Sequence, residues 1–287
     1  MTLRQVRLAA GRRHSLGVVD GGRVRAAGPA TAAECAVTEW RDVVAVAAGN
    51  VHTARNTGQS HSVGLRSDGT LLATGWNMHG QCEVAGWAEM VGIAAGWRRT
   101  VGVRTDGTVL ATGRRNEGAC DVADWSEVVA VSAGDWHTVG LRADGTVVAA
   151  GLNTRGQCAV DRWRGVVGIS VGYLHTVAVR VDGSILTCGD LAAGLAEAND
   201  WQGIATVAAG SHHLLGLTRD GRVLSAGDDA YGQCRTGSWS DVVAIAAGST
   251  HSLGLRRDGV ILATGNNADG QCTLAQAEPA RGGHALA

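Results

Sequence analysis

The chain has 287 residues, of which 43 are glycine, 45% are hydrophobic and 18% are charged. This composition is typical of a compact, turn-rich protein and argues against a disordered one. The formal net charge of −1, with no lysine in the chain, gives no general attraction to nucleic acid or to an anionic membrane. No apolar run approaches the ~20 residues of a membrane span, and the N-terminus has no hydrophobic signal core. We therefore expect a cytoplasmic protein that binds neither nucleic acid nor membranes.

A repeated phrase, G-x-x-H, organises the chain. Its glycine recurs every 38 residues, except for one step of 47 that indicates a nine-residue insertion. The insertion falls within Asn50–His61, and the register leaves open whether His52 or His61 is the repeat histidine. The repeat glycines are Gly11, Gly49, Gly96, Gly134, Gly172, Gly210 and Gly248.

Each repeat predicts β-structure. In "VVAVSAGDWHTVGLRADGTVVAAGLNTRGQCAVDRW" a first and a second strand flank the G-x-x-H turn, and the D-G pair is a strong hairpin signal before a third strand. The final "CAVDRW" predicts a fourth strand. Repeats of about 40 residues with four strands are typical of propeller blades. We predict an all-β protein, a seven-bladed β-propeller over residues 1–274, with a loose tail at 275–287.

The two ends of the repeat region predict how the ring closes. The stretch Gln5–Ser15 matches Val242–Ser252, whereas the last copy stops without a following first strand. We expect the N-terminal strand to pair with the C-terminal blade, so that no sheet edge is left open there.

The series G-x-x-H-[ST]-[LV], D-G and G-x-N-x-x-G-Q resembles the regulator of chromosome condensation (RCC1-type) repeat, in a short form like that of bacterial members. The resemblance covers residues 1–274 and implies a seven-bladed propeller, similar in fold to the propeller-type β-lactamase inhibitors. Nucleotide exchange on a GTPase, chromatin binding and light sensing occur in similar proteins. The near-zero charge disfavours chromatin, and a single G-W-R-R-T phrase disfavours light sensing. Function does not transfer with the fold, because propellers host many unrelated activities.

Residues repeated in register are interpreted as structural. We expect the tryptophans to pack blade against blade, the histidines to hold turns by hydrogen bonds, and the cysteines to stay unbridged, since equivalent positions on neighbouring blades are too far apart. Cys188, which is out of register, is interpreted as a buried spacer. Histidines spread around a ring do not converge on a metal, so we expect no metal and no cofactor. The in-register tryptophans are Trp40, Trp87, Trp125, Trp163, Trp201 and Trp239.

The strand directions place the G-x-x-H turn and the G-x-N-x-x-G-Q loop of every repeat on one face, which we call the loop face. The D-G hairpins lie on the opposite face, the hairpin face. Three tryptophans out of register (Trp76, Trp97 and Trp136) come from consecutive repeats on the loop face. Aromatic side chains rimmed by arginine are typical of binding hot spots. The alternative is that these tryptophans cover the channel mouth and that Arg99 pairs with a loop carboxylate such as Glu117 or Asp135. The predicted ligand-binding residues are Trp76, Met78, His79, Trp97, Arg98, Arg99, Arg114, Arg115, Glu117, Asp135, Trp136 and Tyr173.

The favoured function is a binding module that holds a protein partner, or a small aromatic or anionic ligand, on the loop face. The alternative is a bacterial small-molecule enzyme of secondary metabolism, such as a cyclase, isomerase or hydrolase, with a metal-free pocket at the channel mouth. Its acid/base candidates are Glu117, Asp135 and His79. The sequence contains no nucleophile elbow, phosphate loop or metal signature, so the enzymatic alternative has no motif behind it.

Overall fold

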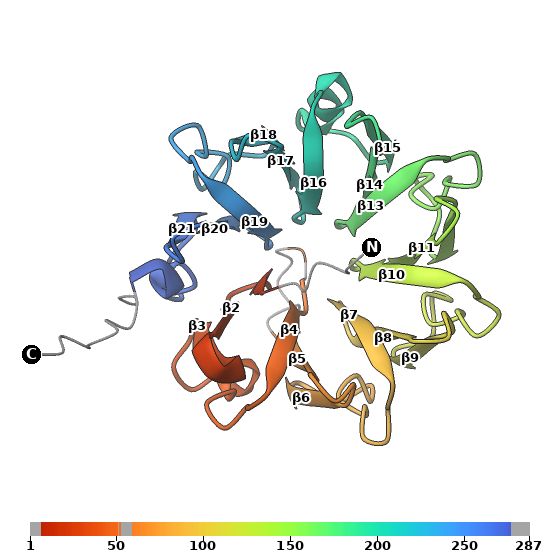
Figure 1. Cartoon of the computed structure of the whole chain (residues 1–287), viewed down its shortest axis with the longest axis vertical. Coiled ribbons are helices and arrows are strands. Elements are labelled where there is room, and N and C mark those ends of the chain that lie inside the picture. Colours follow the sequence, from red (N-terminus) through yellow and green to blue (C-terminus); the bar gives the residue numbers. More distant parts are fainter. Residues whose placement is uncertain (1–6, 51, 53–58, 277–287) are drawn as a thin grey trace, which may run out of the picture.

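The computed structural model describes residues 7–50, 52 and 59–276. In this part of the chain, three-stranded antiparallel sheets, seven in all, stand around a common centre (Figure 1). The predicted all-β propeller is confirmed. The strands of the first four sheets are β1 (Leu8–Ala10), β2 (Ser15–Val19), β3 (Arg23–Ala27); β4 (Val43–Ala48), β5 (His61–Arg66), β6 (Leu71–Gly75); β7 (Met90–Gly96), β8 (Arg99–Arg104), β9 (Val109–Gly113); and β10 (Val128–Ala133), β11 (His137–Arg142), β12 (Val147–Gly151). Those of the last three are β13 (Val166–Val171), β14 (His175–Arg180), β15 (Ile185–Gly189); β16 (Ile204–Ala209), β17 (His213–Thr218), β18 (Val223–Gly227); and β19 (Val242–Ala247), β20 (His251–Arg256), β21 (Ile261–Gly265).

The predicted fourth strand is not formed in the described sheets. The segments that were expected to form it adopt tight turns or short 3-10 helices. After β6, for example, the Cys82 backbone N–H donates to Asn77 Oδ1 at 2.7 Å, and the Glu83 N–H donates to the Gly80 carbonyl. A side chain that bonds nearby backbone competes with a strand ladder, which explains the difference. The 3-10 helices are η1 (Asp20–Gly22), η2 (Ala33–Cys35), η3 (Leu195–Asp200) and η4 (Thr273–Gln276).

The first and last sheets lie side by side (Figure 1), but not through a shared strand. Strand β1 pairs with β2 in its own sheet, which differs from the expected pairing with the C-terminal blade. The two sheets are joined by turns and side chains instead. The Ser249 N–H donates to the Gly11 carbonyl at 3.1 Å, and Ser15 Oγ lies 2.8 Å from His251 Nε2.

The in-register tryptophans pack between neighbouring sheets, as predicted. Trp40 shares one apolar cluster with Leu16 of the first sheet and Val46 of the second. Its ring lies on the backbone of Gly64, where any side chain would overlap it. At ~25 cal/mol per Å² of apolar surface, each such ring contributes several kcal/mol to holding two sheets together.

The repeat histidines also join neighbouring sheets. Five of them donate Nε2–H to a serine or threonine hydroxyl of the next sheet, as His137 does to Thr176 Oγ1 at 2.8 Å. The Thr176 hydroxyl in turn donates to the Gln157 carbonyl at 2.8 Å, so it accepts from the histidine. The prediction that these histidines form hydrogen bonds is confirmed, with the added finding that the bonds are between sheets. The other pairs are His14–Ser62, His61–Thr100, His213–Ser252 and His251–Ser15.

All seven cysteines lie in the described part of the chain and are unbridged. Cys188 is half-buried, its thiol donates to the Gln157 carbonyl at 3.4 Å, and burial raises its pKa to about 11. Such a thiol is a poor nucleophile at neutral pH. Across residues 7–50, 52 and 59–276, no helix has the length and hydropathy needed to cross a membrane.

Candidate functional site

Both variable loops of each repeat lie on the loop face, as the strand directions predict. The N–H of the residue after the third strand donates to the turn between the first two strands. Arg114 N–H bonds the Arg98 carbonyl at 2.8 Å, and Leu152 N–H bonds the Trp136 carbonyl at 3.0 Å. The turn and the loop of a sheet therefore form one surface.

The turn between β7 and β8 differs from its sister turns. Gly96 pairs with Arg99 in the strand register, so Trp97 and Arg98 alone form the turn. Arg98 has φ 66°, a left-handed conformation that side chains other than glycine rarely adopt. Among the described G-x-x-H turns, no other residue at this position has a positive φ. This conformation directs Arg98 across the neighbouring loop.

Arg98 is stacked between two tryptophans. Its Cζ lies 3.9 Å from the Trp97 ring centroid and 4.9 Å from that of Trp76, and its Nη1 lies 3.3 Å from His79 Nε2. Burial lowers the pKa of Arg98 and also that of His79, which Arg98 lowers further. The Met78 side chain beside them is 77% exposed. We call Trp76, Met78, His79 and Arg98 the outer patch.

The remaining arginines of the predicted site have different surroundings. Arg114 forms an ion pair with Glu117, its Nε 2.8 Å from Oε1, and its Cζ lies 5.6 Å from the Trp97 ring. Arg115 is exposed next to it. Glu117, one of the carboxylates expected to pair with Arg99, therefore pairs with Arg114 instead.

Arg99 lies behind the loop face. It is 2% exposed and occupies the place of the repeat histidine. Its Nε donates to Thr138 Oγ1 at 3.0 Å, as a histidine would, and its terminal nitrogens donate to the backbone carbonyls of Gly134, Asp135 and His137. The structure gives Arg99 a role in joining two sheets, and we leave it out of the proposed site.

A second group of rings, deeper than the outer patch, continues the same arc. Trp97 and Trp136 meet edge to face with their centroids 4.8 Å apart. His52 lies 4.3 Å from Tyr173, and Tyr173 lies 5.3 Å from His212. Trp97 is 8% exposed, while Trp136 and Tyr173 are half-buried, so these three predicted residues pack against neighbouring rings rather than projecting as exposed anchors.

Asp135 is the buried acid of the arc. Its Oδ2 accepts from His52 Nδ1 at 2.6 Å and from the His52 backbone N–H at 2.9 Å. Its Oδ1 is buried and has no hydrogen-bond partner among the described residues. Burial raises the pKa of Asp135, while His52 and Arg99 act in the opposite direction. The three acid/base candidates thus have different neighbours: Asp135 is bonded to His52, Glu117 to Arg114, and His79 to Arg98.

The insertion supplies residues that the sequence reading did not single out. His61 is the repeat histidine, since it begins β5 and bonds Thr100, and His52 is therefore the additional one. Asn50 Oδ1 accepts from Ser249 Oγ of the last sheet at 2.9 Å, and His52 reaches Asp135 of the fourth. These contacts join sheets that are not neighbours. Residues 51 and 53–58 of the insertion lie outside the described part of the chain.

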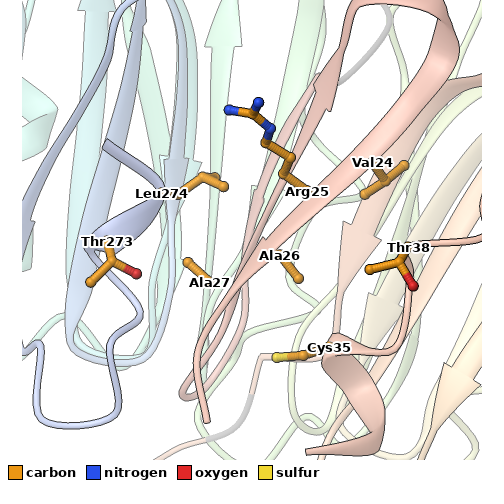
Figure 2. A pocket seen from close by; sticks show the side chains of 8 residues that line it. All are labelled: Val24, Arg25, Ala26, Ala27, Cys35, Thr38, Thr273 and Leu274. Carbon is orange, nitrogen blue, oxygen red and sulfur yellow. The ribbon is translucent and has the colours of Figure 1, made fainter. Parts of the chain in front are cut away.

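Two surface cavities lie away from these residues. One, of about 240 Å³, lies between β3 and η4, and Figure 2 shows its lining side chains, among them Arg25 of β3 and Leu274 of η4. The other, of about 360 Å³, lies on the hairpin face near Gly21 and Ser67. Neither is lined by a residue of the predicted site.

Comparison with known proteins agrees with this architecture. Residues 128–157, 204–233 and 242–271 match the regulator of chromosome condensation (RCC1) repeat. No curated protein gives a significant match to the chain.

Three solved structures share the fold. Prp20p from Saccharomyces cerevisiae, described with its binding to Gsp1p and histones, has a TM-score of 0.64 at 18% identity over 81% of this chain and 74% of that chain. Human WBSCR16 has a TM-score of 0.66 at 17% identity, over 87% and 86%. The CRINKLY WD40 ectodomain of the Arabidopsis thaliana receptor kinase ACR4 has a TM-score of 0.62 at 20% identity, over 77% and 84%. Three of the described sheets match this repeat and all seven stand in a propeller arrangement, so the chain is a β-propeller that contains regulator of chromosome condensation repeats at these three places.

Proposed function

We propose that this propeller is a binding module that holds a partner protein against the outer patch of its loop face. The observation that carries the proposal is the stacking of Arg98 between Trp76 and Trp97, beside the exposed Met78. Tryptophan and arginine are the residue types most enriched in interface hot spots, and methionine is enriched in interface cores.

The outer patch is held in place before any partner arrives. Arg98 lies between two rings and contacts His79, so its guanidinium loses little freedom on binding. Its left-handed φ of 66° costs about 1–2 kcal/mol that the fold must offset. Strained backbone of this kind concentrates at functional positions. Met78 is 77% exposed and supplies apolar surface next to the positive charge of Arg98.

The charge of the patch indicates the chemistry of the partner. Arg114 is paired with Glu117, whereas Arg98 and the exposed Arg115 add positive charge nearby. A guanidinium binds a carboxylate through two parallel hydrogen bonds. We infer a partner that presents an acidic side chain next to an apolar one. Prp20p, a propeller of the same fold, was described with its binding to two kinds of protein.

The enzymatic alternative has less support. Among the described residues, Glu117 is already bonded to Arg114, and Asp135 to His52. The contacts do not favour one reaction class over another, so we retain the binding module.

Affinity capture with paired variants tests the proposal. Arg98→Gly removes the guanidinium and leaves a residue suited to the left-handed conformation. Glu127→Gly is its matched control, because exposed Glu127 has φ 58° on the hairpin face. Wild type and both variants are used as bait in a lysate of the source cells, with quantitative mass spectrometry. We expect a protein retained by wild type and Glu127→Gly and depleted at least tenfold with Arg98→Gly. Equal recovery by all three baits would refute the proposal.

Exposed apolar residues give a second matched pair. Met78→Asp changes the outer patch, and Val181→Asp changes a side chain that is 69% exposed on the hairpin face. Only Met78→Asp is expected to lose the partner. If Val181→Asp loses it instead, the partner binds the hairpin face.

A further inference from the structure

His52 lies among aromatic rings that come from three other sheets. It belongs to the loop between β4 and β5 of the second sheet. Its ring centroid lies 6.0 Å from that of Trp97 in the third sheet, 6.3 Å from Trp136 in the fourth and 4.3 Å from Tyr173 in the fifth. Each centroid distance is within or close to the ~6 Å of cation–aromatic contacts, with the His52 ring at right angles to Trp97 and tilted against Trp136 and Tyr173.

A buried carboxylate completes this enclosure. Asp135 is 2% exposed, and a single oxygen, Oδ2, accepts both the ring nitrogen and the backbone N–H of His52. The second oxygen, Oδ1, has no partner among the described residues, although it is buried. A buried carboxylate is costly unless positive charge and hydrogen bonds compensate it. The nearby cations Arg99 and Arg12 act on Asp135 electrostatically, and Arg99 gives its hydrogen bonds to backbone carbonyls and Thr138.

Aromatic faces combined with a carboxylate are the chemistry by which proteins recognise organic cations. We propose that Trp97, Trp136, Tyr173 and Asp135 form a binding site for a small organic cation, and that the His52 side chain occupies it in this structure as an internal ligand. The enclosure fits a guest the size of an imidazolium ion with one positive charge. The His52 side chain is 16% exposed, which favours a free small molecule over a loop of another protein. The inference does not depend on the outer patch or on its partner.

A His52→Ala variant removes the side chain that occupies the proposed site, so its binding of added cations can be measured. The probes are imidazolium chloride and tetramethylammonium chloride, each compared with sodium chloride at the same ionic strength, and binding is followed by tryptophan fluorescence. Imidazolium carries both a positive charge and a ring N–H that can bond Asp135, whereas tetramethylammonium carries only the charge. We expect His52→Ala to bind both at least tenfold more tightly than wild type, and imidazolium more tightly than tetramethylammonium.

Two second substitutions in the His52→Ala background identify the groups that bind. Asp135→Asn removes the carboxylate charge, and Tyr173→Leu removes the nearest aromatic face. Each is expected to weaken the binding of both cations at least tenfold. Binding that is equal in wild type and His52→Ala, or unchanged by both second substitutions, would overturn the proposal.

If a variant folds poorly, thermal unfolding gives a second measurement of cation binding. A cation that binds only the folded state stabilises that state by RT ln(1 + [L]/Kd), so the effect grows with its concentration. Imidazolium should raise the melting temperature of His52→Ala and leave that of wild type unchanged relative to sodium chloride. If neither cation stabilises His52→Ala, the site does not bind organic cations.

Discussion

Two adjacent arginines perform opposite tasks in this propeller. Arg99 replaces a repeat histidine and is 2% exposed. Its N–H groups donate hydrogen bonds to the next sheet. Arg98 projects over two tryptophans on the loop face. Arg99 thus joins two sheets, whereas the preceding residue in the turn, Arg98, is available to a partner. The left-handed backbone of Arg98 turns its side chain away from that of Arg99.

The left-handed conformation of Arg98 gives a prediction about stability. Glycine adopts φ 66° without the steric cost that alanine meets there. We expect Arg98→Gly to be more stable than Arg98→Ala by about 1 kcal/mol, measured as the free energy of unfolding in urea. If Arg98→Ala is the more stable variant, the left-handed conformation of Arg98 does not strain the backbone at this turn.

At the scale of the element, neighbouring sheets are held by a recurring histidine–hydroxyl bond. Two junctions of the described sheets lack it: at one, Arg99 takes the place of the histidine and bonds Thr138, and at the other, His175 faces a sheet in which Leu214 stands where the others have serine or threonine. His175 Nε2 is buried without a hydrogen-bond partner among the described residues. At that junction Leu214 instead packs in an apolar cluster with Val177. The fold tolerates the exchange of one hydrogen bond for apolar packing.

This contrast predicts the cost of removing a bond. Thr176→Val keeps the volume of the side chain but leaves the His137 Nε2–H unpaired, and the Gln157 carbonyl keeps only the weaker bond from the Cys188 thiol. An unsatisfied buried group costs about 1–3 kcal/mol. Leu214→Val, at the equivalent position of the next sheet, removes only a methylene at about 1 kcal/mol. Urea unfolding should show Thr176→Val to be the more destabilising, although it removes no volume. The opposite order would mean that these hydroxyls contribute little.

For the whole molecule, the buried histidines predict sensitivity to acid. Burial lowers their pKa from the ordinary 6.5, to about 3 for His14 and about 4 for His61. The unfolded chain then takes up protons below pH 6.5 while the folded one does not, so stability is lost as pH falls from 6.5 towards 4. At pH 5.5 each such histidine costs on the order of 1 kcal/mol. The pKa values of His137, His175, His213 and His251 are lowered in the same way.

Calorimetry between pH 7 and pH 5 checks this prediction. The hairpin aspartates, such as Asp68, have pKa values lowered from 3.8 by bonds to the hairpin threonines, so their contribution is lost only at lower pH. A fall in melting temperature between pH 7 and pH 5 is therefore due to the histidines. A constant melting temperature over that range would contradict their burial in neutral form.

The repeat made most of the fold predictable. A period of 38 residues, the D-G hairpins and the alternating apolar strands led to the sheets and to the two faces without further information. The in-register residues were correctly taken as structural because each recurs in the same contact, as Trp40 does on Gly64. The predicted fourth strand failed, since the sequence pattern does not show that Asn77 bonds the Cys82 N–H and stabilises a turn.

The site was predictable only in part. Residues that break the register, such as Trp97, can be found by comparing copies within the chain. Contacts across the ring have no such signal, so the pairing of His52 with Asp135 was missed. Arg99 was grouped with Arg98 because the sequence shows neither which side chain is buried nor that an arginine can replace a histidine in its bond to the next sheet.

The outer patch is the centre of the proposed function, and the ratio of two dissociation constants tests it directly. Once a partner has been recovered, its dissociation constant is measured by calorimetry for Arg98→Gly and for Glu127→Gly, two folded variants that each place glycine at a left-handed position on opposite faces. We predict that Arg98→Gly binds at least tenfold more weakly than Glu127→Gly, which should match wild type. Equal constants for the two variants would show that the stacked arginine of the loop face is not where this propeller binds its partner.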